Sequence, residues 1–368
     1  MVSRWAWAEV SVAAIEHNVR SIAATVAPAQ VWAVVKANGY GHGAVLAARA
    51  ARAGGALGLC VALVQEGVAL REAGVTGPIL VLSEQPAAAL AGAVHHDLAI
   101  TLYSEAQIAA LAACGAVYHP VHLKIDTGMR RVGVSPDDAV ALADVIAASP
   151  AVRLAGVLTH LAAADEPENP FTEHQLDRFD EVLAALAAAG HHPPLVHAAN
   201  SAGALTHPRA RYGMVRAGIA IYGISPGPGV DHLCADLQPA LSLHARVSHV
   251  KRVAAGEGIS YGLRHTFQRD TTVATLPLGY ADGVPRRLQA VGGTVLLGGH
   301  RRRIVGVVTM DQLMVDCGDD DIQPGDDVVL IGSQGGHTIT AADWAEALDT
   351  IAYEIVCGIS ARVERLPV

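Results

Sequence analysis

The feature that most constrains the fold is a regular alternation of short apolar runs with longer, alanine-rich amphipathic stretches between residues 31 and 224. The intervening stretches, such as 135–148 and 173–189, place apolar residues at helical spacing. We interpret eight of the runs as strands: 31–35, 57–62, 78–82, 98–102, 121–125, 154–159, 195–198 and 215–222. Apolar strands that alternate with helices predict a parallel sheet buried on both faces, and eight such units predict an α/β fold with an N-terminal (β/α)8 TIM-type barrel.

A change of pattern near residue 238 predicts a second, mainly β domain. Residues 241–247 alternate apolar and polar side chains, as in a strand with one exposed face. Further short strands are expected at 272–276, 294–297, 304–308 and 328–331, and only 341–348 has a helical pattern. We therefore expect a barrel domain over 1–237 and a β-rich domain over 238–368, with a first strand at 5–10 that could pack in either.

Charge and cysteine usage narrow the class of partner. The net charge is −9, and the only basic cluster is 301–303, which argues against a nucleic-acid surface. The charge-free stretch 106–123 contains His119, Pro120 and His122, so no membrane span is expected. The five cysteines form no CxxC pair, and the N-terminus has no apolar signal-peptide core. We expect a cytoplasmic protein with reduced thiols that acts on small molecules and has no metal site.

Lysine is rare in this chain, since only Lys36, Lys124 and Lys251 occur among 26 basic residues. Barrels of this type place their chemistry at the C-terminal ends of the strands, where Lys36 follows the first predicted strand and Lys124 lies at the end of the fifth. A lysine in an apolar pocket has a lowered pKa and exposes a free amine for covalent chemistry. Further polar side chains are His160 after the sixth predicted strand, Asn200 and Ser201 after the seventh, and Arg216 within the eighth.

The segment VVKANGYGHG at 34–43 resembles the pyridoxal-phosphate attachment segment of bacterial alanine racemases. The resemblance implies a pyridoxal 5'-phosphate-dependent isomerase that interconverts L-alanine and D-alanine, supplies D-alanine for peptidoglycan and forms a homodimer with shared active sites. It extends in order over essentially the whole chain: KIDTGM at 124–129, TH at 159–160, HAANS at 197–201, VRAGI at 215–219, SYG at 260–262, GYADG at 279–283, MDQ at 310–312 and YE at 353–354.

By this resemblance Lys36 attaches the cofactor covalently. A glycine at 218 lets the backbone approach the cofactor phosphate, and a helix beginning at Ser201 favours an anion at its N-terminus. From the residues alone, Ser201 could equally be a helix N-cap and Gly218 a packing glycine. The implied cofactor-binding residues are Lys36, Tyr40, His160, Asn200, Ser201, Arg216, Gly218, Ile219 and Tyr353.

Arg216 by resemblance faces the pyridine nitrogen of the cofactor. A guanidinium does not release its proton, so the ring nitrogen stays unprotonated and the electron sink is weakened. This favours return of a proton to the substrate Cα over transamination or decarboxylation. A barrel-fold decarboxylase of the same cofactor class would place a carboxylate there. Taken without the motif, Arg216 could be an ordinary salt-bridge partner.

Racemisation needs a proton donor or acceptor on each face of the substrate Cα. The resemblance assigns Lys36 to one face, serving D-alanine, and Tyr261 of the partner subunit to the other, serving L-alanine. His160 would link that tyrosine to Arg216, although an isolated histidine of this kind could equally be a core residue.

Substrate binding is assigned by resemblance to Arg131 and to the backbone amide of Met310. Lys124 matches a lysine that is carbamylated in many relatives, where the new anion positions the arginine. The alternative is an unmodified Lys124 paired with Asp126 or another acid. Residues at the substrate entrance would be Asp165, Tyr280, Arg286, Ile351 and Tyr353.

Two departures from the family pattern bear on this site. Arg130 occupies a position that is usually glycine, and Val307 and Thr309 replace an arginine and a cysteine. We therefore expect carboxylate binding and substrate access to differ in detail. A racemase of broader specificity that includes serine, and a non-catalytic pyridoxal-phosphate carrier, remain alternatives, although the second domain with Tyr261 and Tyr353 argues against the carrier.

Overall fold

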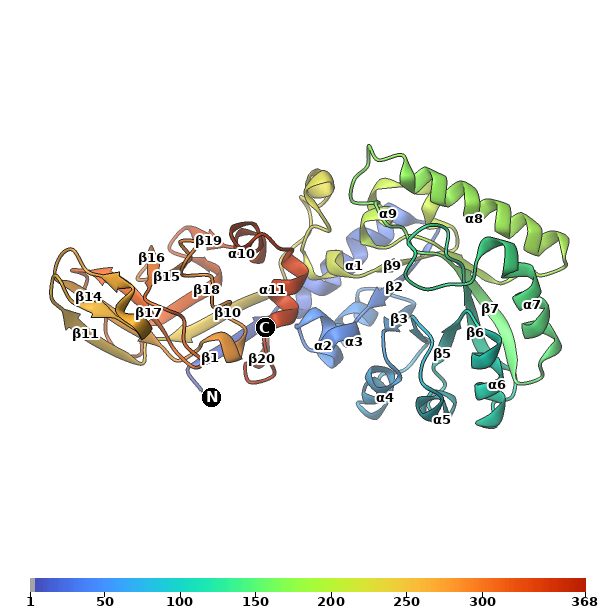
Figure 1. Ribbon diagram of the computed structural model, residues 1–368, viewed down its shortest axis with the longest axis horizontal. Coiled ribbons are helices and arrows are strands. Elements are labelled where there is room, and N and C mark those ends of the chain that lie inside the picture. Colours follow the sequence, from blue (N-terminus) through green and yellow to red (C-terminus); the bar gives the residue numbers. More distant parts are fainter. Residues whose placement is uncertain (1–3) are drawn as a thin grey trace. The chain divides into compact units, whose positions relative to one another are not determined.

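A computed structural model describes residues 4–368 and divides the chain into two compact units (Figure 1). Of the described residues, one unit takes in 4–12, 40–42 and 239–368. The other comprises residues 13–39 and 43–238. We call them the β unit and the barrel unit.

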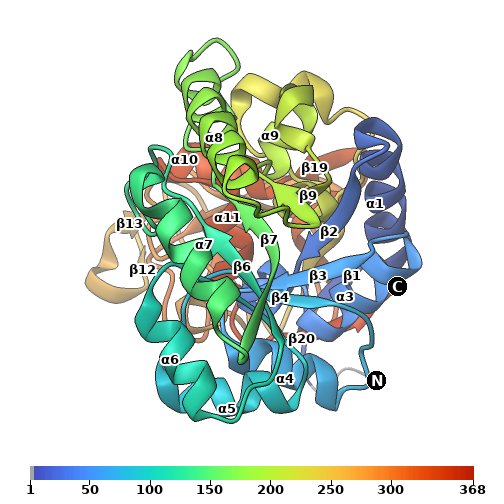
Figure 2. The same ribbon diagram turned by 90° about the vertical axis from the view of Figure 1, so that its right-hand side faces the viewer.

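The barrel unit is built on eight parallel strands, which Figure 2 shows surrounded by helices. Its sheet has the order β8-β7-β6-β5-β4-β3-β2-β9, so neighbours in sequence are neighbours in the sheet. Hydrogen bonds from Gly213 N to Val196 O (3.1 Å) and from Arg216 N to Ala199 O (3.0 Å) join the two outer strands and nearly close the barrel. The predicted barrel is confirmed. The strands are β2 (Gln30–Val34), β3 (Gly58–Val61), β4 (Ile79–Val81), β5 (Ala99–Leu102), β6 (His119–Lys124), β7 (Val152–Leu158), β8 (Leu195–His197) and β9 (Met214–Ala217).

Amphipathic helices cover the outside of this sheet (Figure 1). The longest, α8, buries Leu176, Phe179, Val182 and Leu186, which recur at the spacing of one helix face. The helices of this unit are α1 (Val12–Val26), α3 (Ala44–Ala53), α4 (Val64–Glu72), α5 (Ala87–His95), α6 (Glu105–Ala113), α7 (Ala139–Ala148), α8 (Phe171–Ala188) and α9 (Ser201–Thr206). No helix in residues 4–368 is long and apolar enough to cross a membrane.

The eighth strand ends earlier than its apolar run predicted. We expected a strand over 215–222, but β9 stops at Ala217 and residues 219–222 form a 3-10 turn, η3 (Ile219–Tyr222). Apart from Arg216 the run contains no charged residue, because the turn is as buried as the strand. The strand ends where the amide of Gly218 donates to the side chain of Ser201.

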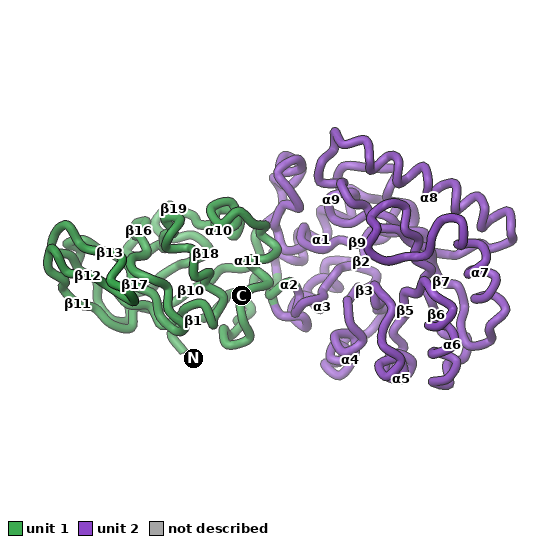
Figure 3. The backbone as a smooth tube through the Cα atoms, viewed as in Figure 1, with its two compact units in different colours: residues 1–12, 40–42, 239–368 green, residues 13–39, 43–238 purple. Residues whose placement is uncertain are grey.

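The β unit, green in Figure 3, contains one large sheet. Its strand order is β11-β14-β17-β16-β15-β18-β10-β1-β20, and β19 pairs with β18. The first strand of the chain, β1, pairs antiparallel with β10 and parallel with β20. Burial alternates along β10, as its sequence pattern predicted. The strands are β1 (Ala6–Val10), β10 (Leu241–Arg246), β11 (His249–Val253), β12 (Gly258–Ile259), β13 (His265–Thr266), β14 (Thr271–Leu276), β15 (Thr294–Leu297), β16 (His300–Val305), β17 (Leu313–Gly318), β18 (Asp327–Gln334), β19 (His337–Ile339) and β20 (Glu364–Pro367).

Two helices, not one, complete the β unit. The predicted helix is present as α10 (Ala341–Leu348), with Asp343 N donating to the Thr340 hydroxyl at 3.0 Å. The expectation that no other helix follows was wrong, because α11 spans Ala352–Gly358. This helix has seven residues and buries only Ile355 and Val356, which is too short a stretch to show a helical period.

Candidate active site

Lys36 follows β2 and begins a turn, α2 (Lys36–Tyr40), whose backbone is left-handed. Ala37, Asn38 and Gly39 have φ angles of 51°, 55° and 62°, and Tyr40 has a φ of 51°. This conformation costs about 1–2 kcal/mol for a residue with an ordinary side chain. A strained turn directly after Lys36 therefore needs restraint from the surrounding structure.

Glu66 supplies part of that restraint. Its carboxylate accepts hydrogen bonds from Ala37 N (2.6 Å), Ala62 N (2.8 Å) and Leu63 N (3.1 Å). One side chain thus ties the turn after Lys36 to the loop between β3 and α4. No role was assigned to Glu66 from the sequence, because the N-cap residue of α4 is Leu63, whose side chain cannot accept a hydrogen bond and so gives no capping-box pattern.

Arg216 lies at the end of β9 and is only 4% exposed. Its Nη2 donates to the carbonyls of Thr159 (2.8 Å) and Ala198 (2.9 Å) and lies 3.2 Å from His160 Nδ1. Its Nη1 donates to His197 Nδ1 at 2.7 Å. Within residues 4–368 it forms no ion pair, so the salt-bridge alternative is not observed. Burial lowers its pKa to about 10, which still leaves it protonated at neutral pH.

Three histidines around this arginine are held neutral. Burial first, and then the charge of Arg216, lower the pKa of His160 and of His197 well below the ordinary range. The same causes lower the pKa of His122 to about 3. The Nε2 of His197 lies 2.9 Å from Nδ1 of His122. His197 and His122 had no assigned role in the sequence, although polar residues inside apolar strands are a usable indication of a buried network.

Ser201 and the amides after β9 form a small donor cluster. Gly218 N and Ala220 N donate to the Ser201 hydroxyl at 2.8 and 3.4 Å. The residue that caps α9 is Asn200, whose Oδ1 accepts from Gly203 N at 2.9 Å. The hydroxyl of Ser201 is therefore directed to the end of β9 instead of serving as the N-cap. A hydroxyl beside backbone amides is suited to hold a phosphate.

Lys124, Arg131 and His160 line one small cavity of about 10 Å³ at the ends of β6 and β7. The pKa of Lys124 is lowered to about 8, mainly by burial and then by the charges of Arg216, Arg131 and Lys36. The barrel therefore gathers these four cationic residues at one end. A lysine with so low a pKa has a substantial neutral fraction near pH 8.

The loop that carries Arg131 is organised by Asp126. The Asp126 carboxylate accepts from Gly128 N and Arg130 N, both at 3.0 Å. Among the described residues it forms no ion pair with Lys124, so that pairing is not observed. Arg130 has a φ of 57°, which explains physically why glycine is the residue best suited to this position.

Cys60, on β3, was also unassigned. Burial raises the pKa of its thiol to about 12, against the opposing charges of Arg216 and Lys36. The side chain therefore stays an uncharged thiol beside the cationic end of the barrel.

Tyr261 lies in the β unit and is 74% exposed. It begins the turn η5 (Tyr261–Leu263), which is anchored by a 2.9 Å hydrogen bond from the Ser260 hydroxyl to Val307 O. Met310 and Tyr280 are also exposed, and their loops are joined by a hydrogen bond from Ala281 N to Met310 O at 3.0 Å. The β unit thus presents several large apolar side chains to its surface.

The predicted site residues divide between the two units. Tyr40 and Tyr353 lie together in the β unit, with ring centroids 6.0 Å apart. Asp165 packs beside Gly227 in the barrel unit, and Arg286 is exposed in the β unit. The barrel unit holds Lys36, Lys124, Arg131, His160, Asp165, Asn200, Ser201, Arg216, Gly218 and Ile219, and the β unit holds Tyr40, Tyr261, Tyr280, Arg286, Met310, Ile351 and Tyr353.

The described residues contain no cluster of three or more His, Cys, Asp or Glu side chains arranged to hold a metal ion. The donor set at the barrel end suits an organic anion instead. Within the described part of the chain, the acceptors of the buried Arg216 guanidinium are all neutral, and the Ser201 hydroxyl lies beside backbone amides. These groups fit a cofactor that combines a ring nitrogen with a phosphate.

Comparisons with known proteins agree with this donor set. The family model of the alanine racemase N-terminal domain matches residues 10–226, and that of the C-terminal domain matches residues 240–367. The alanine racemase of Symbiobacterium thermophilum is 49% identical over 363 residues, covering 98% of this chain and 96% of its own. That of Thermobifida fusca is 45% identical over 371 residues, covering 99% and 98%.

Solved structures of alanine racemases are also similar to this chain. The alanine racemase from Bacillus anthracis, with bound L-Ala-P, has a TM-score of 0.95 and 39% identity, and the match covers 100% of this chain and 96% of that one. The alanine racemase from E. faecalis has a TM-score of 0.92 and 39% identity, with 99% and 98% coverage.

Proposed function

The chain belongs to the alanine racemase family and is an isomerase, and from this premise we propose that it interconverts L-alanine and D-alanine with pyridoxal 5'-phosphate attached to Lys36. The product D-alanine would serve peptidoglycan synthesis in the cytoplasm. The unit of function is a homodimer in which each site combines Lys36 of one chain with Tyr261 of the partner subunit.

The observation that carries the proposal is the buried, unpaired charge of Arg216. When bound, the cofactor withdraws electrons from the substrate Cα. We assign to Arg216 a hydrogen bond to the ring nitrogen, which is an uncharged acceptor like its other partners. Because the pKa of Arg216 remains about 10, it keeps its protons at neutral pH and does not protonate that nitrogen. A decarboxylase would need a carboxylate at this place.

The cofactor phosphate is assigned to the cluster at the end of β9. Ser201 and the amides of Gly218 and Ile219 supply donors, and the close approach of Gly218 N to the Ser201 hydroxyl supports this placement. By the resemblance, the hydroxyls of Tyr40 and Tyr353 complete the set. Asn200 holds α9 in position through its bond from Gly203 N.

Two bases act on the substrate Cα. The amine of Lys36 takes or returns the proton on one face, and the phenol of the partner's Tyr261 does so on the other. His160 accepts at Nδ1 from Arg216, so in its neutral form it carries its proton on Nε2 and can donate to that phenol. The high exposure of Tyr261 in a single chain supports its use by a second subunit.

Arg131 holds the substrate carboxylate, helped by the amide of Met310. We propose that Lys124 is carbamylated: its neutral amine nitrogen bonds to the carbon of CO2, and one proton leaves to solvent. The lowered pKa of Lys124 supports this step, since only the neutral amine reacts. The resulting anion lies in the cavity that Arg131 also lines and positions its guanidinium. Asp165, Tyr280, Arg286 and Ile351 are assigned to the substrate entrance.

The test is to incubate the purified protein with pyridoxal phosphate and each L-amino acid separately, and to follow circular dichroism of the amino acid. L-alanine should lose its optical activity to zero, and Lys36→Ala protein should leave it unchanged. Borohydride should fix the cofactor on the peptide that contains residue 36. A stable signal from L-alanine, or labelling at Lys124 or Lys251, would contradict the proposal.

A further inference from the structure

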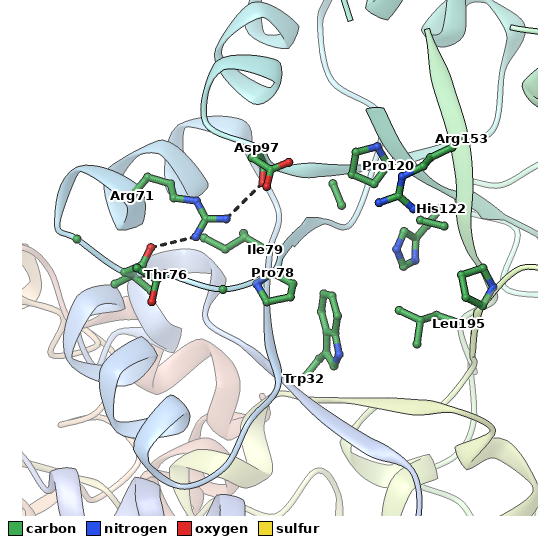
Figure 4. Close-up of a pocket in the computed structure, with 16 residues that line it drawn as sticks. Trp32, Arg71, Thr76, Pro78, Ile79, Asp97, Pro120, His122, Arg153 and Leu195 are labelled. Carbon is green, nitrogen blue, oxygen red and sulfur yellow. Dashed lines mark hydrogen bonds between the residues drawn. The ribbon is translucent and has the colours of Figure 1, made fainter. Parts of the chain in front are cut away.

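Figure 4 shows a second, larger cavity of the barrel unit. Its volume is about 770 Å³, within the range of small-molecule sites. Lys36 follows the C-terminal end of β2, whereas this cavity is lined by residues at the N-terminal ends of strands, such as Ile79 of β4, Ala99 of β5 and Leu195 of β8. It is therefore separate from the site described above.

The cavity wall combines apolar surface with positive charge. Figure 4 shows Trp32, Pro78, Ile79 and Leu195 around the opening. A Cβ on Gly58 would lie 2.4 Å from the indole of Trp32, so a glycine at 58 is what leaves room for that ring. An apolar wall of this kind accepts the hydrocarbon part of a ligand.

Two arginines and one acid line the same wall. Arg71 donates to the carbonyls of His96 (3.0 Å) and Val75 (3.0 Å), which are neutral groups. Arg153 lies 5.8 Å from the ring centroid of Tyr118, and within residues 4–368 it forms no ion pair. The only carboxylate in the lining is Asp97, so two cations face one anion.

A directed chain of hydrogen bonds runs from Arg216 to this cavity. A guanidinium can only donate, so Arg216 Nη1 donates to His197 Nδ1. Neutral His197 then carries its proton on Nε2 and donates to His122 Nδ1 at 2.9 Å. Neutral His122 therefore carries its proton on Nε2. The low pKa values of both histidines keep them in these neutral forms at neutral pH.

The last donor of this hydrogen-bonded series, His122 Nε2, has no acceptor among residues 4–368. His122 lines the cavity, and no hydrogen bond to its Nε2 occurs among the described residues. A Cβ on Gly156 would lie 2.4 Å from His122 Nδ1, so the glycine makes room for the ring in this position. Figure 4 shows the Arg153 guanidinium next to His122, and an N–H donor near a guanidinium is an arrangement that suits an anion.

We propose that this cavity is a binding site for a small organic monocarboxylate with an apolar body. The carboxylate accepts from His122 Nε2 and pairs with Arg153, and the apolar body packs against Trp32. His122 is hydrogen-bonded through His197 to Arg216. A bound carboxylate therefore adds an acceptor at the His122 end of the hydrogen-bond series that orients Arg216. This site and its ligand do not depend on the reaction assigned above.

Phenylacetate is a suitable probe, with phenylacetamide as its uncharged match and inorganic phosphate as an anion without an apolar body. Calorimetry on the full, cofactor-loaded protein should show that phenylacetate binds at least about tenfold more tightly than phenylacetamide or phosphate. Phenylacetamide lacks the charge-assisted hydrogen bond, and phosphate lacks the apolar contact. Trp32 emission should change on binding, and Trp32→Phe protein should lack that change.

Substitutions test whether phenylacetate binds in this cavity. Arg153→Gln should weaken phenylacetate by about tenfold or more, whereas Arg20→Gln, an exposed cation of the same unit, should not. Arg131→Gln should also bind normally, which separates this cavity from the substrate site. Thermal unfolding confirms that each variant is folded. Equal affinity for phenylacetamide, unchanged affinity in Arg153→Gln, or loss of binding in Arg131→Gln would overturn the proposal.

Discussion

The carboxylate of Glu66 accepts a hydrogen bond at 2.6 Å from the backbone amide of Ala37, the residue after Lys36. Ala37 and Glu66 are 29 positions apart in sequence, and they lie in the turn after β2 and in helix α4, respectively. The contact stabilises a left-handed turn that alanine does not favour by itself. The position of Lys36 therefore depends on a side chain outside its own segment.

Replacement of Glu66 should loosen this turn. Glu66→Ala removes the acceptor of three backbone amides, and we expect the free energy of unfolding to fall by about 1–3 kcal/mol and the cofactor to bind more weakly. Glu66→Gln keeps a carbonyl oxygen and should recover part of both losses. Denaturant unfolding and cofactor titration measure them. Glu72→Ala, at the exposed end of the same helix, is the control, and equal effects at both positions would refute the role of Glu66.

Arg130→Gly should stabilise the protein. Arg130 has a φ of 57°, so glycine removes a strained conformation, and we expect a gain of about 0.5–1 kcal/mol in the free energy of unfolding. Arg264→Gly is the matched control, because Arg264 has a φ of −72° and glycine there should destabilise. Urea unfolding of both variants checks this. A loss of stability in Arg130→Gly would mean that the arginine side chain makes a stabilising contact that outweighs the strain.

Lys124 should react with CO2 near pH 8. Its pKa of about 8 leaves about half of the amine neutral there, whereas an ordinary lysine is almost entirely protonated. With carbon-13 bicarbonate, NMR should show a carbamate resonance in the wild type but not in Lys124→Arg. Lys251→Arg, which replaces an exposed lysine, is the control and should keep the resonance. A resonance that survives in Lys124→Arg would place the modification elsewhere.

The same pKa shift predicts a pH dependence of stability in buffer free of CO2. Burial lowers the pKa of Lys124 from 10.5 to about 8, so between these values the unfolded chain holds a proton that the folded chain has released. The free energy of unfolding should therefore rise with pH over this interval, by at most about 3 kcal/mol from this residue. Lys124→Met lacks the titrating group and should not show this increment. If the free energy of unfolding depended on pH in the same way in the wild type and in Lys124→Met, the lowered pKa of Lys124 would be contradicted.

Much of the barrel could be predicted because its strands are short apolar runs bounded by polar turns. The strand prediction failed where buried residues do not form a strand, as in residues 219–222, which are buried but form a turn. Strand β11 was missed for the opposite reason, since most of its residues are exposed or half-buried. Helix α11 was missed because it is too short to show a period.

The sequence predicted a site residue only where its type is unusual for its immediate surroundings in the sequence. Lys36 stood out because lysine is rare, and Arg216 because it is a charged residue within the apolar run 215–222. The contact of His122 with His197 joins residues 75 positions apart, and no local pattern specifies it. The left-handed turn was also hidden, since Gly39 permits that conformation but Ala37 does not favour it.

The most direct test of the two-base mechanism is Cα proton exchange in deuterated water with Tyr261→Ala protein. This variant keeps Lys36 and lacks the base assigned to L-alanine. Exchange of D-alanine should persist, while that of L-alanine should fall by about 10²–10⁴-fold, the usual contribution of one general base. Tyr280→Ala, which removes another exposed tyrosine of the β unit, should not separate the two isomers in this way. Equal residual exchange of L-alanine and D-alanine in Tyr261→Ala would contradict the assignment of one base to each face.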